Sequence, residues 1–257
     1  QRDLCPAPRL DCDRLTAASS ERLRGAMALG GELYLADQRV LVEPGLHLLL
    51  AKSTYESLGD RGNERVPPTF DALPSPRAAA RVLLKPWLLL RMSCGRFVRL
   101  PTFLELFGDG AFFRKSLGLR PESAWTGELG IEAHGQLFSR LSTALSLHAF
   151  GRTIDDLIDI VRDGPTLRAR NVGQATTAGV ELASAAHFGE LLHVELNYAF
   201  LDSRDRTDQP GRSGNLLPGR PQHTVFLRSE AAYRTAHLFY ELDHASAVYL
   251  DPANLVL

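Results

Sequence analysis

The segment from Ala178 to Asp202 constrains the fold most, because two stretches of alternating side chains flank a short polar turn. Between Leu192 and Phe200, large apolar side chains alternate with His193, Glu195 and smaller residues. A period of two is typical of a β-strand. The turn over 187–190 therefore predicts an antiparallel hairpin. One apolar and one polar face suit either a sheet half exposed to water or a membrane barrel with a polar lumen.

Composition excludes several classes of protein. The chain has 29 basic and 30 acidic residues, so it lacks the positive charge that nucleic-acid binding needs. Its 44% hydrophobic content suits a folded protein. Apolar runs such as Leu46–Ala51 and Val82–Leu90 are far shorter than the roughly 20 residues of a membrane helix. The start has no methionine and no signal-peptide pattern, so we expect a processed chain or a piece of a longer one.

The connections between the other alternating segments follow a rule. We expect short turns at Asp37, Pro86, Gly135, Gly189 and Thr235, and long loops around Arg61, Phe107, Asp159 and Arg212. The loop at Arg61 is expected to run from Thr54 to Pro76. Many segments reach the roughly 9 to 11 residues that a tilted strand needs to cross a bilayer.

These regularities predict an all-β fold. We interpret residues 1–257 as a segment of an antiparallel transmembrane β-barrel, with about ten long strands, short periplasmic turns and long external loops. Ten strands could close on themselves, or further strands outside this sequence could complete the wall, because an open sheet would leave two unpaired edges in lipid. A soluble sandwich or lipocalin-like barrel should have shorter strands and no such rule for its connections.

Six motifs, in order from about Leu84 onward, resemble those of the TonB-dependent outer-membrane receptors. They are Arg99–Asp109 (RLPTFLELFGD), Leu119–Glu122 (LRPE), Asp155–Ile158 (DDLI), Asn171–Ala175 (NVGQA) leading into Gly179, Leu217–Pro221 (LPGRP), and Tyr249–Asp251 (YLD) with Asn254. The positions that carry the resemblance are Pro101, Glu105, Phe107, Pro121, Glu122, Asn171, Gly173, Gly179, Pro218 and Pro221.

The resemblance implies a barrel of about 22 strands with an N-terminal plug domain. This sequence contains no plug domain, no segment similar to the TonB-contacting box and no closing strand with a terminal aromatic residue. We therefore expect an internal to C-terminal part of the barrel. Lys115–Gly118 stands where the family often has an Asn-Pro pair, which puts the conformation of that loop in doubt.

Physical roles for the motif residues need no ligand. Pro101 and Pro121 would fix the backbone where strand gives way to loop. Gly173 and Gly179 suit a bulge or the close approach of another chain segment. Asn171 could hydrogen-bond the backbone at a kink.

Charged side chains of both signs fall on the polar strand face. We expect them to face the lumen, where they would contact either the plug or only water. These residues are Arg91, Glu128, Glu132, Arg140, Glu181, Glu195, Arg228 and Glu230.

Two of the three cysteines, Cys5 and Cys12, lie close together in a loop and could form a disulfide in an oxidising compartment, or remain unpaired.

No catalytic fingerprint is present, so we predict no enzyme activity and no cofactor. A wall triad of Asp243, His244 and Ser246 is poorly arranged, because adjacent strand residues point to opposite faces. An external metal site from the loop aspartates at 155, 156, 159 and 163 lacks the calcium-loop pattern, and solvated acids explain these residues better.

The resemblance implies an active transporter in the outer membrane of a Gram-negative bacterium, embedded in lipid. Its expected partners are its own plug domain, TonB and a small-molecule ligand such as a metal chelate, a siderophore or cobalamin. Loops Pro101–Leu119 and Ser203–Pro218 would form part of the ligand mouth. The alternative is a complete small barrel acting as a porin or a hydrolase. The sequence does not identify the ligand.

Overall fold

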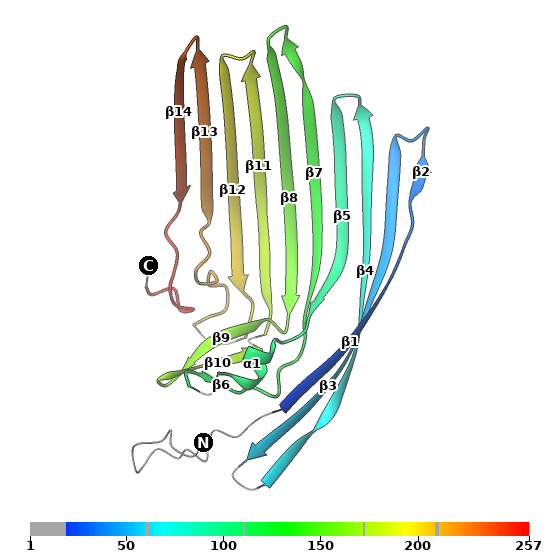
Figure 1. The fold of residues 1–257 in the computed structure, drawn as a ribbon, viewed down its shortest axis with the longest axis vertical. Helices are drawn as coiled ribbons and strands as arrows, with labels where there is room; N and C mark the ends of the chain where they lie inside the picture. The colour runs from blue at the N-terminus through cyan, green and yellow to red at the C-terminus, as the bar shows by residue number, and fades with distance from the viewer. Residues whose placement is uncertain (1–18, 60–61, 110, 172, 209–210, 257) are drawn as a thin grey trace.

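Long antiparallel strands form one curved sheet in the computed structural model, which describes residues 19–59, 62–109, 111–171, 173–208 and 211–256. The strands lie side by side in the order β1-β3-β4-β5-β7-β8-β11-β12-β13-β14, and the short β2 also pairs with β3 (Figure 1). Within the described residues this path contains ten main strands, which confirms the predicted fold class.

The sheet strands are β1 Ser19–Gly30, β2 Leu33–Leu35, β3 Val40–Gly59, β4 Gly62–Lys85, β5 Leu88–Arg99, β7 Glu122–Phe138, β8 Leu141–Asp155, β11 Ala175–Phe188, β12 Leu192–Asp205, β13 His223–Tyr233 and β14 Ala236–Ala245. The smaller elements are α1 Phe103–Phe107, β6 Phe113–Arg114, β9 Ile158–Asp163 and β10 Thr166–Asn171. Apart from β2, every strand of the sheet has at least ten residues, which matches the length predicted for crossing a bilayer.

Tight turns join successive strands at one end of the sheet, which we call the short-turn end (top of Figure 1). Gly189 and Arg234 adopt positive φ angles of 55° and 54° there, as tight hairpin turns require. The turn predicted at Gly135 was wrong. Gly135 pairs with Thr143 inside the β7–β8 ladder, and the chain turns after Phe138 instead. Glycine permits a turn but does not require one, because neighbouring strand pairing can hold it extended.

The long loop predicted over Thr54–Pro76 was also wrong, since β3 and β4 continue through it as a hairpin. Its prolines suggested a loop because proline cannot donate a ladder hydrogen bond. Pro74 and Pro76 lie opposite Leu48 and Leu46 of β3, but the pairing of β4 with β5 begins only at Arg77. The prolines thus occupy a part of β4 that has a strand partner on one side only, where a missing donor is tolerated.

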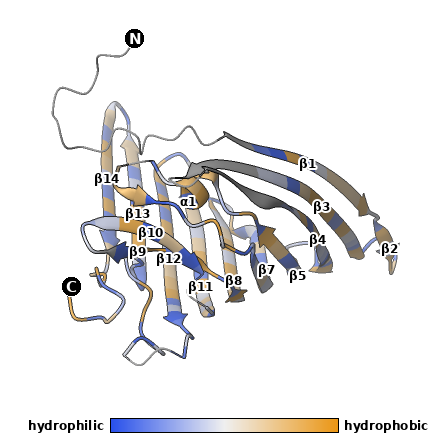
Figure 2. Cartoon of the chain, turned by 90° about the horizontal axis from the view of Figure 1, so that it is seen from below, coloured by the Kyte–Doolittle hydropathy of each residue, from blue (hydrophilic) through white to orange (hydrophobic). Residues whose placement is uncertain are grey.

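The register separates two faces of the sheet. Leucine, isoleucine and tryptophan side chains of successive strands form the apolar face, and many remain exposed, such as Leu29 at 76% and Leu238 at 70%. Figure 2 shows the curvature of the sheet and the alternation of apolar and polar residues along the strands. The open hollows of the wall are lined mainly from the polar face, so the sheet curves around that face.

The elements outside the main sheet form a compact unit at the opposite end, which we call the loop cap: α1, β6, β9 and β10 (bottom of Figure 1). Strand β10 pairs parallel with β6 and antiparallel with β9. Phe113, Ile158 and Ala169 are buried together, with Leu119 packed against them. A second cluster of Ile154, Ala175 and Leu217 joins the strand ends to the following loop. The buried apolar core of the described chain therefore lies mainly at this end.

Strands β1 and β14 end the sheet, and each has a ladder partner on one side only within the described residues. The short β2 follows β1 in the chain and pairs with β3. A search of the described helices for a membrane-spanning segment finds none of sufficient length and hydropathy.

Candidate functional site

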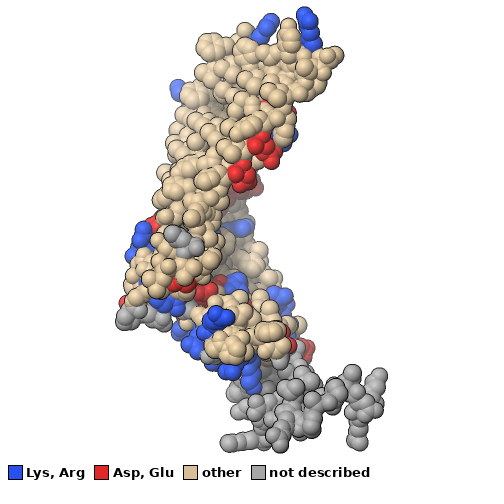
Figure 3. All heavy atoms as spheres, turned by 90° about the vertical axis from the view of Figure 1, so that its left-hand side faces the viewer, with Lys and Arg blue, Asp and Glu red and all other residues tan. Residues whose placement is uncertain are grey.

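Two regions carry the polar chemistry of the structure: the polar face of the wall and the loop cap. In Figure 3 Lys and Arg side chains gather over the lower end of the molecule, where the loop cap lies, while the wall above is largely uncharged on the side shown. Most of the residues that the sequence assigned to the lumen lie on the polar face.

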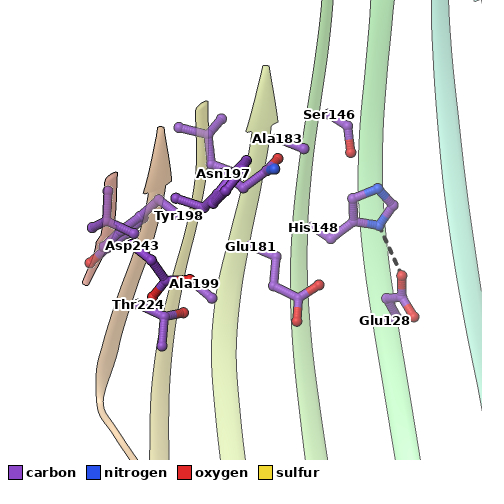
Figure 4. A pocket seen from close by; sticks show the side chains of 13 residues that line it. Glu128, Ser146, His148, Glu181, Ala183, Asn197, Tyr198, Ala199, Thr224 and Asp243 are labelled. Atoms are coloured by element: carbon purple, nitrogen blue, oxygen red, sulfur yellow. Dashed lines mark hydrogen bonds and ion pairs between the residues drawn. The ribbon is translucent and has the colours of Figure 1, made fainter. Parts of the chain in front are cut away.

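The ladder registers bring the predicted lumen-facing residues onto one face. Gly130, His148, Glu181, Ala199 and Thr224 lie in a row across five strands. His148, Glu181, Ala199 and Thr224 of this row line an open hollow of about 640 Å³, together with Glu128, Asn197 and Asp243. Figure 4 shows the side chains that line this hollow.

A hydrogen-bonded group lies beside this hollow. The Nδ1 of His148 is 2.8 Å from Glu128, and its Nε2 is 3.9 Å from Glu132 (Figure 4 marks the first contact). Arg91 pairs with Glu132 at 2.6 Å. Four residues from three strands are therefore linked across the wall, and such exposed pairs add little stability individually.

Further along the same face, Arg228 donates from Nε to Glu230 at 2.8 Å, and the register places it opposite Glu195. Glu195 in turn accepts from the amide of Asn197 at 3.0 Å. Seven of the eight charged residues assigned to the lumen thus lie on one face of the sheet. Their contact with a plug domain remains a prediction.

Arg140 is the exception, and its placement on a strand was wrong. It lies in the turn between β7 and β8, where its carbonyl oxygen accepts from the Gly189 amide at 2.7 Å. Because the turn falls five residues later than predicted from Gly135, Arg140 belongs to the rim of the short-turn end.

At the other end, Arg99 joins the wall to the loop cap. Its Nε donates to Glu122 at 2.6 Å, and its terminal nitrogen contacts both carboxylate oxygens of Glu105 at 3.0 and 3.1 Å. The Glu105 and Glu122 side chains are only 15% and 14% exposed. Glu122 also accepts from the amide of Ile158 at 2.6 Å. One guanidinium therefore ties the end of β5 to the helix, to the start of β7 and, through Glu122, to β9.

Helix α1 begins with a capping box. The Thr102 hydroxyl accepts from the Glu105 amide, and the Glu105 carboxylate accepts from the Thr102 amide at 2.7 Å. Burial alone would raise the pKa of Glu105, but the hydrogen bonds from Arg99 and Thr102 outweigh it and lower that pKa below the usual value. Glu105 is therefore a charged anchor of the loop cap at neutral pH.

The turn after α1 is fixed by a carboxylate. Asp109 accepts from the amides of Ala111 and Phe113, each at 2.8 Å, and these bonds lower its pKa. Gly108 has a φ of 71°, and a Cβ there would collide with the carbonyl of Phe113. The RLPTFLELFGD motif is thus explained by backbone geometry and packing.

Asn171 holds three segments together through its side-chain amide. Its oxygen accepts from the Arg120 amide, and its nitrogen donates to the carbonyls of Arg120 and Asp156 at 3.0 and 2.7 Å. The Ser116 hydroxyl, which is buried, donates to the carbonyl of Ala169 at 2.6 Å. Backbone groups of the loop cap without a strand partner are satisfied in this way.

Two motif glycines permit close approach. Gly173 has a φ of 104°, and a Cβ there would lie 2.7 Å from the Thr207 methyl group. At Gly179 a Cβ would meet the Phe150 ring at 2.6 Å as well as the carbonyl of Phe200. The other motif prolines, at 101, 121, 218 and 221, lie just outside strands, and the carbonyl of Pro101 accepts from Arg22 at 2.7 Å.

The segment after β14 secures the loop that follows β12. Asn254 accepts from the Leu216 amide and donates to its carbonyl, at 2.8 and 2.9 Å. Asp251 accepts from the amides of Ala253, Leu255 and Val256. The buried Asp205 pairs with Arg212 at 3.2 Å. This second loop assembly lies beside the loop cap at the same end of the wall (Figure 1).

The residues of the possible wall triad and the loop aspartates have structural partners. The Ser246 hydroxyl accepts from the amides of Gln222 and His223, and Asp243 and His244 pair with successive residues of β13. Asp155 accepts from Gln174, and Asp156 pairs with Arg120. In the described part of the chain no three His, Cys, Asp or Glu side chains are grouped to hold a metal ion. Cys5 and Cys12 lie outside the described residues.

Sequence reasoning missed Arg99, Ser116, Asp205 and Asp251 as organising residues. For Arg99 a signal existed, since Thr102 and Glu105 have capping-box spacing directly after it. Asp251 lies in the YLD motif, but its bonds to the amides that follow were not predicted. For Ser116 and Asp205 no local signal existed, because their partners are distant in sequence or depend on loop conformation.

Comparisons with known proteins follow this geometry. The family model "TonB dependent receptor-like, beta-barrel" matches residues 19–255. A search of curated proteins finds no match.

Among solved structures, the unliganded ferric citrate transporter FecA has a TM-score of 0.67 at 17% identity and aligns with 93% of this chain and 34% of its own. The ferric preacinetobactin receptor BauA from Acinetobacter baumannii gives 0.66 at 16% identity, with 93% and 35% covered. The siderophore receptor PiuA from the same organism gives 0.67 at 17%, with 92% and 35% covered. The chain thus spans about a third of the length of these three proteins.

Proposed function

The chain belongs to the TonB-dependent receptor-like β-barrel family, and from this premise we propose that it forms part of the wall and external mouth of an outer-membrane transporter for a scarce small molecule. The observation that carries the proposal is the division of the sheet: one apolar face for lipid, one polar face for the lumen, and elaborated loops at one end only.

The apolar face supports a place in a bilayer. Its leucine, methionine and aromatic side chains are widely exposed, and a soluble protein rarely leaves so many large apolar residues in water. Further strands of the whole protein would pair with β1 and β14, so that no open edge faces lipid. The seven charged residues of the polar face would then line the lumen and face a plug domain.

The loop end supports a role in ligand capture. The loop cap and the loop after β12 are held by buried hydrogen bonds and ion pairs, so they form defined surfaces. The expected ligand is a metal chelate such as a siderophore, or cobalamin. The proposed energy source is TonB acting on the plug. The structurally similar proteins named above, which are a transporter and two siderophore receptors, support a role in ligand uptake.

Uptake measurements test this proposal. In a host lacking its own ferric-siderophore receptors, the complete protein is expressed with or without a working TonB, and uptake of radiolabelled ferric chelates and cobalamin is followed. We expect uptake of at least one ligand that needs both proteins. Equal uptake without TonB would contradict active transport and favour the porin alternative.

Loop deletions test the ligand mouth. Shortening Pro101–Leu119 or Ser203–Pro218 in the complete protein should weaken binding of the identified ligand. Substituting Ser139 and Arg140, in a turn at the opposite end of the wall, should leave binding unchanged. Unchanged affinity after a deletion would remove that loop from the ligand mouth. In gel electrophoresis, a folded barrel migrates differently before and after boiling, so this change in mobility would show that each variant still forms a barrel.

A further inference from the structure

A pair of histidines lies at the short-turn end, away from the loops. His187 of β11 and His193 of β12 are direct cross-strand partners, one step before the turn. Their Nδ1 atoms are 3.0 Å apart, and their ring centroids are 4.1 Å apart at an interplanar angle of 27°. Both imidazoles lie on the side of the wall that also carries Glu195.

The pair lines an open hollow of about 380 Å³ together with Glu190, Glu230 and His237. Glu230 lies opposite His193 on β13 but is held by Arg228. The hollow is open to solvent and combines three imidazoles and two carboxylates with apolar side chains such as Leu238 and Phe239. Cations could reach it from the solvent at the short-turn end.

Two other histidines on the wall have different partners. His148 bonds to a carboxylate, and the ring of His223 contacts the hydroxyl of Tyr198. His134 lies on the same face of β7, and its imidazole makes no hydrogen bond within the described residues. The 187–193 pair thus differs from them in presenting two ring nitrogens to each other.

The spacing of the two nitrogens fits one metal ion. Metal–imidazole bonds are about 2.0 to 2.1 Å long, so donors 3.0 Å apart subtend about 95° at a shared ion. Both nitrogens are therefore close enough to reach one ion.

Binding would require small changes at the pair. In the present contact one Nδ1 must carry a hydrogen and the other must accept it. A shared ion needs a lone pair on both, so that hydrogen would move to Nε2 of the same ring, which changes the tautomer and releases no proton. The two rings would also turn toward each other so that their lone pairs converge.

We propose that His187 and His193 form a Cu²⁺-binding site at the short-turn end of the wall. Imidazole is a good ligand for copper, and Cu²⁺ binds nitrogen sites more tightly than the other first-row divalent ions. Because no third metal-ligating side chain joins the pair among the described residues, water completes the coordination. This site is separate from any ligand mouth formed by the loops.

The test uses the complete protein, purified in detergent without a histidine tag and titrated with CuCl₂. Electron paramagnetic resonance should show Cu²⁺ coupled to two imidazole nitrogens. His187→Gln and His193→Gln should each lower the affinity for Cu²⁺ at least about tenfold. Replacing a residue that only supports a metal ligand already lowers metal affinity about 10 to 100-fold. His134→Gln, the matched control on the same face, should bind as the wild type does.

Equal binding by His193→Gln and the wild type would overturn the proposal, as would an equal loss in His134→Gln. If a variant fails to form a heat-modifiable barrel, a protection experiment on the wild-type protein still tests the proposal. Cu²⁺ should protect His187 and His193, and not His134, from diethyl pyrocarbonate, with the modified peptides identified by mass spectrometry. Unprotected His187 and His193 in saturating CuCl₂ would refute the site.

Discussion

Replacing Arg99 by alanine should loosen the loop cap while the wall stays intact. The change removes one ion-pair partner from each of two largely buried carboxylates, Glu105 and Glu122. Removing one partner of a fully buried pair costs about 3 to 5 kcal/mol. Because the Arg99 side chain is itself 41% exposed and partly screened, we expect about 2 kcal/mol for local opening of the loop cap.

Hydrogen exchange of the α1 amides measures this local opening. The amides of Leu106 and Gly108 are bonded to the carbonyls of Thr102 and Leu104, so they exchange when the helix opens. A loss of about 2 kcal/mol should raise their exchange about 30-fold. Arg99→Lys should fall between wild type and alanine, because an ammonium keeps the charge but loses the fork geometry.

The matched control is Arg91→Ala, which removes an ion pair of the wall, Arg91 with Glu132, without touching the loop cap. It should leave exchange at Leu106 and Gly108 unchanged. Wild-type exchange at these amides in Arg99→Ala would refute the argument that the guanidinium holds the loop cap to the wall.

Three further outcomes are expected. Gly179→Val should destabilise the barrel by about 1 to 3 kcal/mol, because its Cβ would lie 2.6 Å from the Phe150 ring. Gly151→Val, which has open space around it, should destabilise the barrel less. The temperature at which half of each variant loses its heat-modifiable gel band compares the two. The folded pKa of Glu105 is lowered, so its contribution is complete at neutral pH and is lost as pH falls below the unfolded value of 4.5. The protection of the α1 amides, corrected for the pH dependence of intrinsic exchange, should fall below that pH, and Glu105→Gln should flatten this profile. Asn171→Ala should destabilise the loop cap by about 1 to 3 kcal/mol, because it leaves backbone groups without hydrogen-bond partners. Hydrogen exchange of the amides in β9 and β10 should then become faster. Unchanged exchange there would contradict the bridging role of Asn171.

Local pattern predicted the wall well because strand alternation reports burial directly. The hairpin around Gly189 formed as expected, and the residues from Arg91 to Glu230 that alternate with apolar neighbours share one face. The failures at Gly135 and at Thr54–Pro76 have a common cause. Glycine and proline report what a residue permits when alone, but a partner strand decides whether the ladder continues.

The loop cap could not be predicted in the same way. Asn171 was correctly suspected of bonding the backbone, but the segments that it joins, at Arg120 and Asp156, are 51 and 15 residues away. The three-stranded sheet of β6, β9 and β10 includes a parallel pair between segments that the sequence shows only as loops. Contacts of this kind leave no periodic trace along the chain.

The sequence by itself determined the strand content and the two faces, because each depends on neighbouring residues and a period of two. It also indicated the alternation of tight and long connections, except between β3 and β4, which form a hairpin. Tertiary structure alone decided where the strands end, how Arg99 joins the wall to the loops, and that His187 and His193 meet. Those features depend on which backbone segments lie side by side, and many different partners would satisfy the same local pattern.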